Sequence, residues 1–261
     1  MMSINSRLVS KNLSRFKLVT FDVTDTLLKF SRPPEIQYAM AARHQGCQNI
    51  EEKALAGCFR THFKRMARDY PNFGKGSPYD WRWWWRTLVM DIFRDSHRHL
   101  SEAMLSRIAD QLIEDYETRD CWTKIEFADQ LIDLVRAQGK QVGIISNFDP
   151  RLSYILEAMQ IPTDFIVTSY DAGIQKPCRE IFDFALNLCN QRVLPSEALH
   201  IGNTPHLDYI GAQRAGWASI LVNVGSESQQ GISLDSEINP KHVFANFREF
   251  IHVLETNELK W

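Results

Sequence analysis

Four segments of the chain carry side chains that could together transfer a phosphoryl group. Asp22 ends a hydrophobic run that begins at Leu18, and Ser146 ends a second hydrophobic run. Lys176 lies in a loop after a third hydrophobic run, and Asp208 ends an acidic loop after a fourth hydrophobic run. A carboxylate can attack phosphorus and form an acyl phosphate, while a hydroxyl and an ammonium can bind phosphate oxygens and offset their charge. Open α/β sheets place their chemistry at the carboxyl ends of strands, where these residues are expected. The four residue types in this order predict a phosphoryl-transfer site with an aspartate nucleophile.

These segments resemble the motifs of the haloacid dehalogenase superfamily, in which Asp-x-Asp-x-Thr is followed by serine or threonine, then by lysine, and then by Gly-Asp with a further aspartate. The similarity runs from about residue 15 to about residue 225, and within the superfamily the chain resembles the haloacid-dehalogenase-like domain-containing protein 3 type, which includes insect rhythmically expressed gene 2 proteins. The stretches that carry it are Phe21 to Leu28, Tyr70 to Gly74, Ser146 to Asp149, Lys176-Pro177 with Ile181-Phe182, and His200 to Gly202. The resemblance implies a Rossmann-like α/β fold, an aspartyl-phosphate intermediate and a Mg²⁺ cofactor.

The resemblance also assigns a role to each matching position. Asp22 would be the nucleophile, and Thr26 would secure its loop by hydrogen bonding. The catalytic residues carried over are Asp22, Thr24 and Lys176; those that would bind the phosphate are Ser146, Asn147 and Lys176; those that would hold Mg²⁺ are Asp22, Thr24, Asn203 and Asp208. His206 lies in the same acidic loop, but we expect it to face solvent rather than to bind a metal.

Two positions depart from the family pattern, and both lack a carboxylate. Thr24 stands where phosphatases of the family have the aspartate that protonates the leaving group and later activates water. Threonine has no pKa suited to that work, and general acid–base catalysis typically contributes roughly 10²–10⁴-fold. Asn203 stands where those phosphatases have an aspartate that binds Mg²⁺, so an oxygen is kept but a negative charge is lost. We therefore expect slow turnover and weak metal binding, and Asp25, one residue along from Thr24, is not expected to replace the missing acid.

The composition is that of an ordinary globular protein. The chain has 261 residues, of which 44% are hydrophobic and 24% charged, and its net charge is −2. That charge indicates no nucleic-acid partner, and no apolar run approaches membrane-spanning length. Five cysteines without CxxC spacing favour free thiols in a reducing compartment over disulfides or a zinc site. The basic segment before Asp22 has the character of a mitochondrial presequence, but it leads directly into the first strand, so we expect a cytoplasmic or nuclear location instead.

Short hydrophobic runs alternate with amphipathic ones from residue 125 onward, which predicts repeated strand–helix units. Strands are expected near residues 18–23, 142–145, 165–167, 198–201 and 218–222, and helices near 127–138, 151–159 and 181–188. Such repeats build a parallel sheet with helices on both faces. The predicted fold class is therefore α/β, with a Rossmann-like parallel sheet as its core.

Residues 31–116 instead show helical periodicity without strand alternation. We predict that residues 1–30 and 117–261 form the α/β core, and that residues 31–116 form an all-helical cap inserted after the first strand. In the family that the chain resembles, an insertion at this point covers the active site and selects the substrate. Trp81, Trp84 and Trp85 share one helix face there, and we expect them to form the core of the cap rather than a wall of the substrate pocket.

Three functions fit these observations. The first is a slow Mg²⁺-dependent phosphatase that acts on a small phosphorylated molecule and uses no nucleic acid or membrane. The second is a catalytically degenerate member, a pseudophosphatase that binds a phosphorylated ligand or a protein partner, because both departures remove carboxylates that support turnover while the phosphate-binding residues are kept. The third is a metal-independent 2-haloacid dehalogenase, which ranks last because the loop from Gly202 to Asp208 resembles the phosphatase branch more closely.

Overall fold

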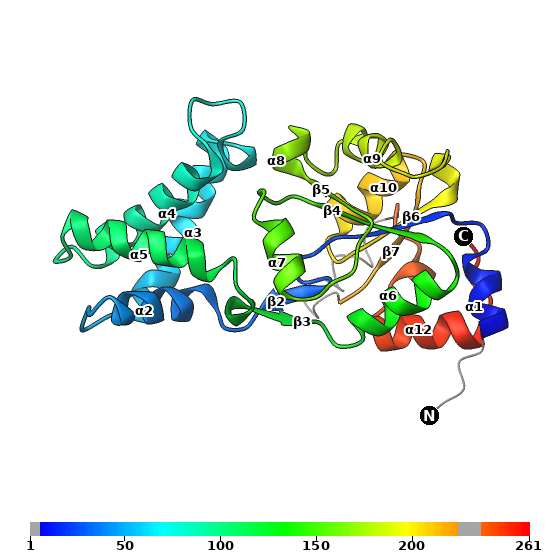
Figure 1. The fold of residues 1–261 in the computed structure, drawn as a ribbon, viewed down its shortest axis with the longest axis horizontal. Helices are drawn as coiled ribbons and strands as arrows, with labels where there is room; N and C mark the ends of the chain where they lie inside the picture. The colour runs from blue at the N-terminus through cyan, green and yellow to red at the C-terminus, as the bar shows by residue number, and fades with distance from the viewer. Residues whose placement is uncertain (1–5, 224–235) are drawn as a thin grey trace. The chain divides into compact units, whose positions relative to one another are not determined.

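The computed structural model describes residues 6–223 and 236–261, which fold into two compact units (Figure 1). The first, which we call the α/β unit, comprises Met1–Lys29, Lys124–Asn147 and Ile161–Trp261. The second, the helical unit, comprises Phe30–Thr123 and Phe148–Gln160. These bounds differ from those we expected, since residues 117–123 and 148–160 group with the helical unit.

Residues 148–160 contact the helical unit through both polar and apolar side chains. The carboxylate of Asp149 accepts a hydrogen bond from the Trp85 indole at 2.7 Å and pairs with the Arg151 guanidinium at 2.8 Å. Both charged residues are buried, and the guanidinium lies 5.0 Å from the Trp85 ring centre. Ile155 is buried beside them in an aromatic-lined pocket of the same unit. The Trp85 indole thereby links the buried Asp149–Arg151 pair of this segment to the rest of the helical unit.

Five parallel strands form the sheet of the α/β unit, in the order β5-β4-β1-β6-β7. Their bounds are β1 Leu18–Phe21, β4 Gln141–Ser146, β5 Phe165–Thr168, β6 Ala198–Gly202 and β7 Ala218–Leu221. Phe21 is in register with Ile144 of β4 and with Ile201 of β6. The carboxyl ends of β1, β4 and β6 therefore lie side by side at one edge of the sheet. The predicted α/β fold class with a Rossmann-like parallel sheet is confirmed.

Helices cover the sheet on both faces, as Figure 1 shows, with α9 and α10 on one side and α6 and α12 on the other. The described helices of this unit are α1 Ser6–Leu13, α6 Ala128–Ala137, α8 Ser169–Ala172, α9 Arg179–Leu186, α10 Gly211–Arg214 and α12 Phe247–Thr256. Short helical turns occupy Pro195–Glu197, Pro205–Ile210 and Pro240–His242. Because both faces are covered, nearly every residue of the central strands is buried, which explains why they read as continuous hydrophobic runs.

The basic segment at the start of the chain is a packed helix of the fold. Val9 and Leu13 on α1 are buried, and α1 packs against α12. The Asn12 amide donates hydrogen bonds to the carbonyls of Leu254 and Asn257, at 2.9 and 2.7 Å. These contacts join the two ends of the described chain.

The helical unit contains α2 Pro34–His44, α3 Glu52–Asp69, α4 Trp81–Ser96, α5 Glu102–Asp115 and α7 Leu152–Ala158, with turns at Asn72–Gly74 and Arg119–Cys121. Asp80 and Ser101 cap α4 and α5 by accepting hydrogen bonds from the backbone N–H groups of Trp83 and Met104. Two short strands, β2 Leu28–Phe30 and β3 Trp122–Lys124, pair where the chain passes from one unit to the other. Their three-residue lengths are too short to produce a periodic pattern in the sequence.

The tryptophans of α4 belong mainly to the core of the helical unit. Trp84 is 1% exposed and Leu88 is fully buried in one apolar cluster of this unit. Trp85 packs against that cluster, whereas Trp81 is partly exposed.

Among the described helices, none is long and apolar enough to cross a membrane.

Candidate active site

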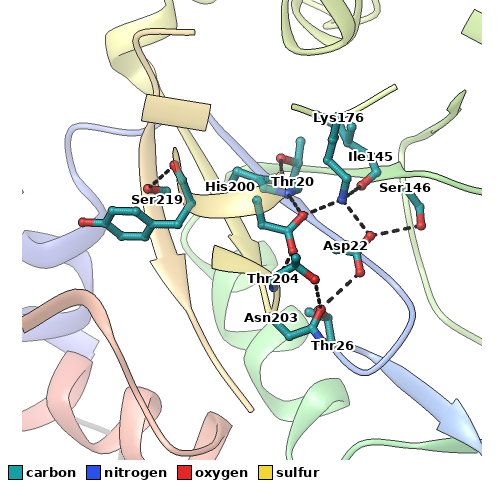
Figure 2. A network of polar contacts seen from close by, with 12 residues as sticks. Thr20, Asp22, Thr26, Ile145, Ser146, Lys176, His200, Asn203, Thr204 and Ser219 are labelled. Carbon is teal, nitrogen blue, oxygen red and sulfur yellow. Dashed lines mark hydrogen bonds and ion pairs between the residues drawn. The ribbon is translucent and has the colours of Figure 1, made fainter. Parts of the chain in front are cut away.

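Three of the predicted site residues meet at the carboxyl edge of the sheet, as Figure 2 shows. Asp22 follows β1, Ser146 ends the neighbouring β4, and Lys176 comes from the loop between α8 and α9. The Ser146 hydroxyl donates to Asp22 Oδ1 at 3.0 Å, and the Lys176 ammonium donates to the same oxygen at 2.7 Å. The parallel register of β1 and β4 is what brings residues 124 positions apart into contact.

Lys176 is buried, and its ammonium donates three hydrogen bonds. Besides Asp22, the acceptors are Asp208 Oδ1 at 2.6 Å and the Ile145 carbonyl at 2.9 Å. Burial alone would lower the pKa of Lys176, but the charges of Asp208 and Asp22 outweigh it, and the pKa is raised. The lysine is therefore a permanent cation whose three N–H bonds are all directed by the fold.

The two carboxylates that share this cation differ in environment. Burial raises the pKa of Asp22, with Lys176 opposing that rise. Burial also acts on Asp208, but Lys176 and His200 outweigh it and hold the pKa of Asp208 well below its usual range. The second oxygen of Asp208, Oδ2, accepts from the Thr204 N–H at 2.8 Å. Both oxygens of Asp208 thus have protein donors.

Gly202 makes room for this arrangement. A Cβ atom at position 202 would lie 2.3 Å from Asp208 Cγ, closer than side-chain atoms approach. The glycine of the acidic loop is therefore required by the buried carboxylate, since any other side chain would displace it.

His200 is a member of the site to which the resemblance assigned no role. It is fully buried on β6, with Nε2 3.3 Å from Asp208 Oδ1 and Nδ1 2.8 Å from the Thr20 hydroxyl. Burial lowers the pKa of His200, so the ring is neutral. Asp208 can only accept, so Nε2 carries the hydrogen and Nδ1 accepts from Thr20. A polar residue between Leu199 and Ile201, in an otherwise apolar strand, was the available signal.

The Asn147 side chain faces the backbone of Lys176. Its Oδ1 accepts from the Lys176 N–H at 2.8 Å, and its Nδ2 donates to the Lys176 carbonyl at 3.0 Å. We expected this amide to bind phosphate. In the structure, its oxygen and one of its hydrogens are engaged by the lysine loop.

The remaining predicted positions lie around the turn that follows Asp22. Thr26 is fully buried, and its hydroxyl lies 3.2 Å from Asn203 Oδ1 and 3.5 Å from Asp22 Oδ2. Thr24 is partly buried and bridges to Leu28, and its hydroxyl makes no hydrogen bond within the described chain. The turn places Asp25 in the left-handed region, with φ of 59° and an exposed side chain. Burial, together with the charge of Asp22, raises the pKa of Asp25.

His206 is exposed, as expected for a loop histidine without a ligand role. Among the described residues, no cluster of three or more His, Cys, Asp or Glu side chains could hold a metal ion alone.

The residues beside Asp22 fit a magnesium ion in part. Asp22 Oδ2 accepts only one contact, from the Thr26 hydroxyl, and so keeps a lone pair, whereas Asn203 Oδ1 accepts from the hydroxyls of both Thr26 and Thr204, at 3.2 and 3.4 Å. Proteins bind Mg²⁺ through one or two carboxylates together with phosphate oxygens and water. The Asp22 carboxylate oxygen matches that donor set, and the Asn203 oxygen would join it by giving up a hydroxyl hydrogen bond. Asp208 Oδ1 is engaged by Lys176 and His200, and Oδ2 accepts a single hydrogen bond from Thr204.

Comparison with known proteins identifies the family of the chain. A family model for haloacid dehalogenase-like hydrolases matches residues 16–216. The chain is 35% identical over 262 residues to the Rhythmically expressed gene 2 protein of Drosophila melanogaster, covering 96% of this chain and 100% of the relative. It is 35% identical over 210 residues to the Haloacid dehalogenase-like hydrolase domain-containing protein 3 of Bos taurus, covering 80% of this chain and 82% of the relative.

Solved structures share the fold at lower identity. The putative HAD-hydrolase YfnB from Bacillus subtilis, solved with bound magnesium, has a TM-score of 0.63 at 21% identity and covers 92% of this chain and 99% of its own. The 2-haloacid dehalogenase of Pseudomonas syringae has a TM-score of 0.62 at 23% identity and covers 92% and 98%. These likenesses concern the fold alone. The family model and the two curated relatives confirm the predicted membership: this chain belongs to the haloacid dehalogenase-like hydrolase family, and within it to the type of haloacid dehalogenase-like hydrolase domain-containing protein 3 and rhythmically expressed gene 2 protein.

Proposed function

We propose that the protein slowly hydrolyses a small phosphorylated substrate through a phosphorylated Asp22. The observation that supports this most directly is the asymmetry of the Asp22 carboxylate. Oδ1 accepts from both Ser146 and Lys176, whereas Oδ2 has a single contact of 3.5 Å, with Thr26. Oδ2 is therefore the oxygen with a lone pair free to attack phosphorus, while Oδ1 is held by two donors.

In the first step, Asp22 Oδ2 forms a bond to phosphorus as the bond to the leaving oxygen breaks. Lys176 and Ser146 orient the carboxylate, and the ammonium offsets the negative charge that gathers around it. Water then attacks the acyl phosphate, which releases inorganic phosphate and restores the carboxylate. A magnesium ion, which Asp22 and Asn203 would help to hold, would supply further charge neutralisation at the phosphate oxygens.

Turnover is slow in this proposal because no acid stands beside the leaving group. Thr24 offers a hydroxyl where a carboxyl group is needed, so the leaving oxygen must take its proton from water. Asp208 is not available for that task, since Lys176, His200 and Thr204 occupy its oxygens. We assign Asp208 the role of holding Lys176 rather than that of binding metal.

A second candidate is a pseudophosphatase that binds a phosphorylated ligand or a protein partner without turnover. It is favoured by the same pattern of residues, because Asp22, Ser146 and Lys176 are assembled while the carboxylates at positions 24 and 203 are missing. Dehalogenation of a small 2-haloacid ranks third. Release of halide from a panel of chloroacids would support it.

The deciding experiment measures hydrolysis of p-nitrophenyl phosphate with and without Mg²⁺. The wild type is compared with Asp22→Asn, which keeps the side-chain shape, and with Asp133→Asn on the exposed face of α6 as a matched control. Activity that needs Mg²⁺, survives in the control and is lost in Asp22→Asn supports the phosphatase. If the wild type is no faster than Asp22→Asn, the general phosphatase is refuted, and binding of phosphorylated ligands becomes the assay.

A further inference from the structure

The segment that carries Lys176 has no regular secondary structure to hold it. It lies between Gly173, which ends α8, and Arg179, which begins α9. Yet the Lys176 ammonium meets three acceptors at 2.6–2.9 Å, which demands that its backbone be fixed. Something other than a helix or a strand must therefore position this loop.

Asn147 meets that requirement from one side. Its amide accepts from the N–H and donates to the C=O of one residue, Lys176, which is the pattern that a neighbouring strand would supply. Within the described chain, Asn147 Oδ1 is the acceptor of the Lys176 N–H, and no other is found. Because Asn147 directly follows Ser146, the clamp joins the loop to the end of β4, next to Asp22.

Gly211 supports the same loop from another side. A Cβ at position 211 would lie 3.0 Å from Pro177 Cβ and 3.1 Å from Pro177 Cα, so the backbone of α10 approaches the loop closely. The loop is thus held both by a hydrogen-bonded amide and by close packing.

We propose that Asn147 is a positioning residue for Lys176 and not a ligand of the phosphate. The amide sets the lysine backbone, and the backbone sets where the ammonium lies relative to Asp22. Few other side chains could do this: an ionised aspartate has no donor for the carbonyl, and serine is shorter and has a single hydrogen. The catalytic consequence rests on the proposed function, but the clamp itself does not.

Hydrogen exchange of the Lys176 amide tests the clamp without any activity. In Asn147→Ala we expect this amide to exchange roughly three- to tenfold faster than in the wild type, the range that loss of one net hydrogen bond represents. Asn190→Ala is the control, because Asn190 is exposed and its side chain makes no hydrogen bond in the described structure. An unchanged Lys176 exchange rate in Asn147→Ala would overturn the clamp.

A second variant tests the positioning role through its pH dependence. Protonated aspartic acid has one donor and one acceptor, like asparagine, whereas the ionised form only accepts. In Asn147→Asp, we expect affinity for inorganic phosphate with Mg²⁺, relative to the wild type at the same pH, to be reduced about tenfold at pH 8 and to recover to about half only near pH 4, where an ordinary aspartate is about half protonated. Asn147→Ala should show no such recovery, since it cannot regain the donor.

The outcomes separate the clamp from the proposed function. If Lys176 exchange rises in Asn147→Ala but phosphate affinity equals that of the wild type at each pH, the positioning role is refuted. If both variants lose affinity equally at all pH values, Asn147 contacts the phosphate directly and the proposal fails. If the wild type binds no phosphate, the proposed function is refuted, and amide exchange alone decides whether the clamp exists.

Discussion

Replacement of Gly202 by alanine should disrupt the buried charge network from within. The new Cβ would lie 2.3 Å from Asp208 Cγ and 2.4 Å from Asp208 Oδ2, against a minimum near 3.0 Å for real contacts. Asp208 must therefore move by about 0.7 Å or more. It cannot swing into solvent, because it is 1% exposed.

That displacement sets the size of the effect. The hydrogen bonds from Lys176 Nζ and Thr204 N, now 2.6 and 2.8 Å, would lengthen to the limit of a hydrogen bond. Breaking a buried ion pair typically costs about 3–5 kcal/mol, since a charge is left without its partner. We therefore expect Gly202→Ala to lower the free energy of unfolding by about 3 kcal/mol, and to lower phosphate affinity through the misplaced Lys176.

Urea unfolding followed by circular dichroism measures the change in stability. Gly57→Ala is the matched control, because Gly57 lies inside α3, has no positive φ, and leaves open space within 4 Å of where a Cβ would lie. There the same substitution should stabilise by about 0.5–1 kcal/mol, through the lower conformational entropy of the unfolded chain. The two substitutions should therefore have opposite signs. If Gly202→Ala unfolds within about 1 kcal/mol of the wild type, Asp208 is not held as the structure describes.

Three further predictions concern the site and the helical unit. The double variant Thr24→Asp with Asn203→Asp should raise the hydrolysis rate of p-nitrophenyl phosphate by roughly 10²–10⁴-fold if only those carboxylates are missing, and an unchanged rate would favour the pseudophosphatase. Because burial raises the pKa of Asp22 above 3.8, kcat/KM should fall as pH drops, with a midpoint above that value; a midpoint below it would contradict the buried carboxylate. His97 accepts from the Glu51 N–H at 2.9 Å, and burial lowers the pKa of His97 below 6.5. The unfolded chain then takes up the proton more readily, so stability should be complete above pH 6.5 and decrease as pH falls below it. Urea unfolding across this pH range should show a smaller loss of stability in His97→Gln than in the wild type. An equal loss of stability would mean that other groups cause the pH dependence.

The α/β fold could be predicted because local patterns and global architecture agree. The hydrophobic runs that lead to Asp22 and Ser146 are neighbouring parallel strands, and both are covered by helices on two faces. Residue types agree with the element ends that the structure shows: Gly139, with φ of 69°, follows α6, and Ser101 caps α5. Assembly of Asp22, Ser146 and Lys176 followed from the rule that parallel strands present their carboxyl ends at one edge.

Elements that depend on packing were not predicted. Helices α1 and α12 lie at opposite ends of the described chain and pack against each other, and neither was predicted. Strands β2 and β3 are three residues each, below the length at which alternation is visible. The grouping of residues 148–160 with the helical unit depends on the Asp149–Arg151 pair and on Trp85, which is 64 residues from Asp149 in the sequence.

The sequence by itself determined the family, the fold class and the candidate nucleophile, because those depend on residue types at fixed spacing along strands and turns. Only the tertiary structure decided which partner each polar side chain takes. The Asn147 amide hydrogen-bonds the Lys176 backbone, and the Lys176 ammonium donates to Asp208. His200, on β6, contacts the same Asp208 oxygen. The physical reason is that a buried polar group must find a hydrogen-bond partner among whatever the packed fold brings near it. Those neighbours come from strands and loops 8 to 32 residues apart in the sequence, which no local pattern records.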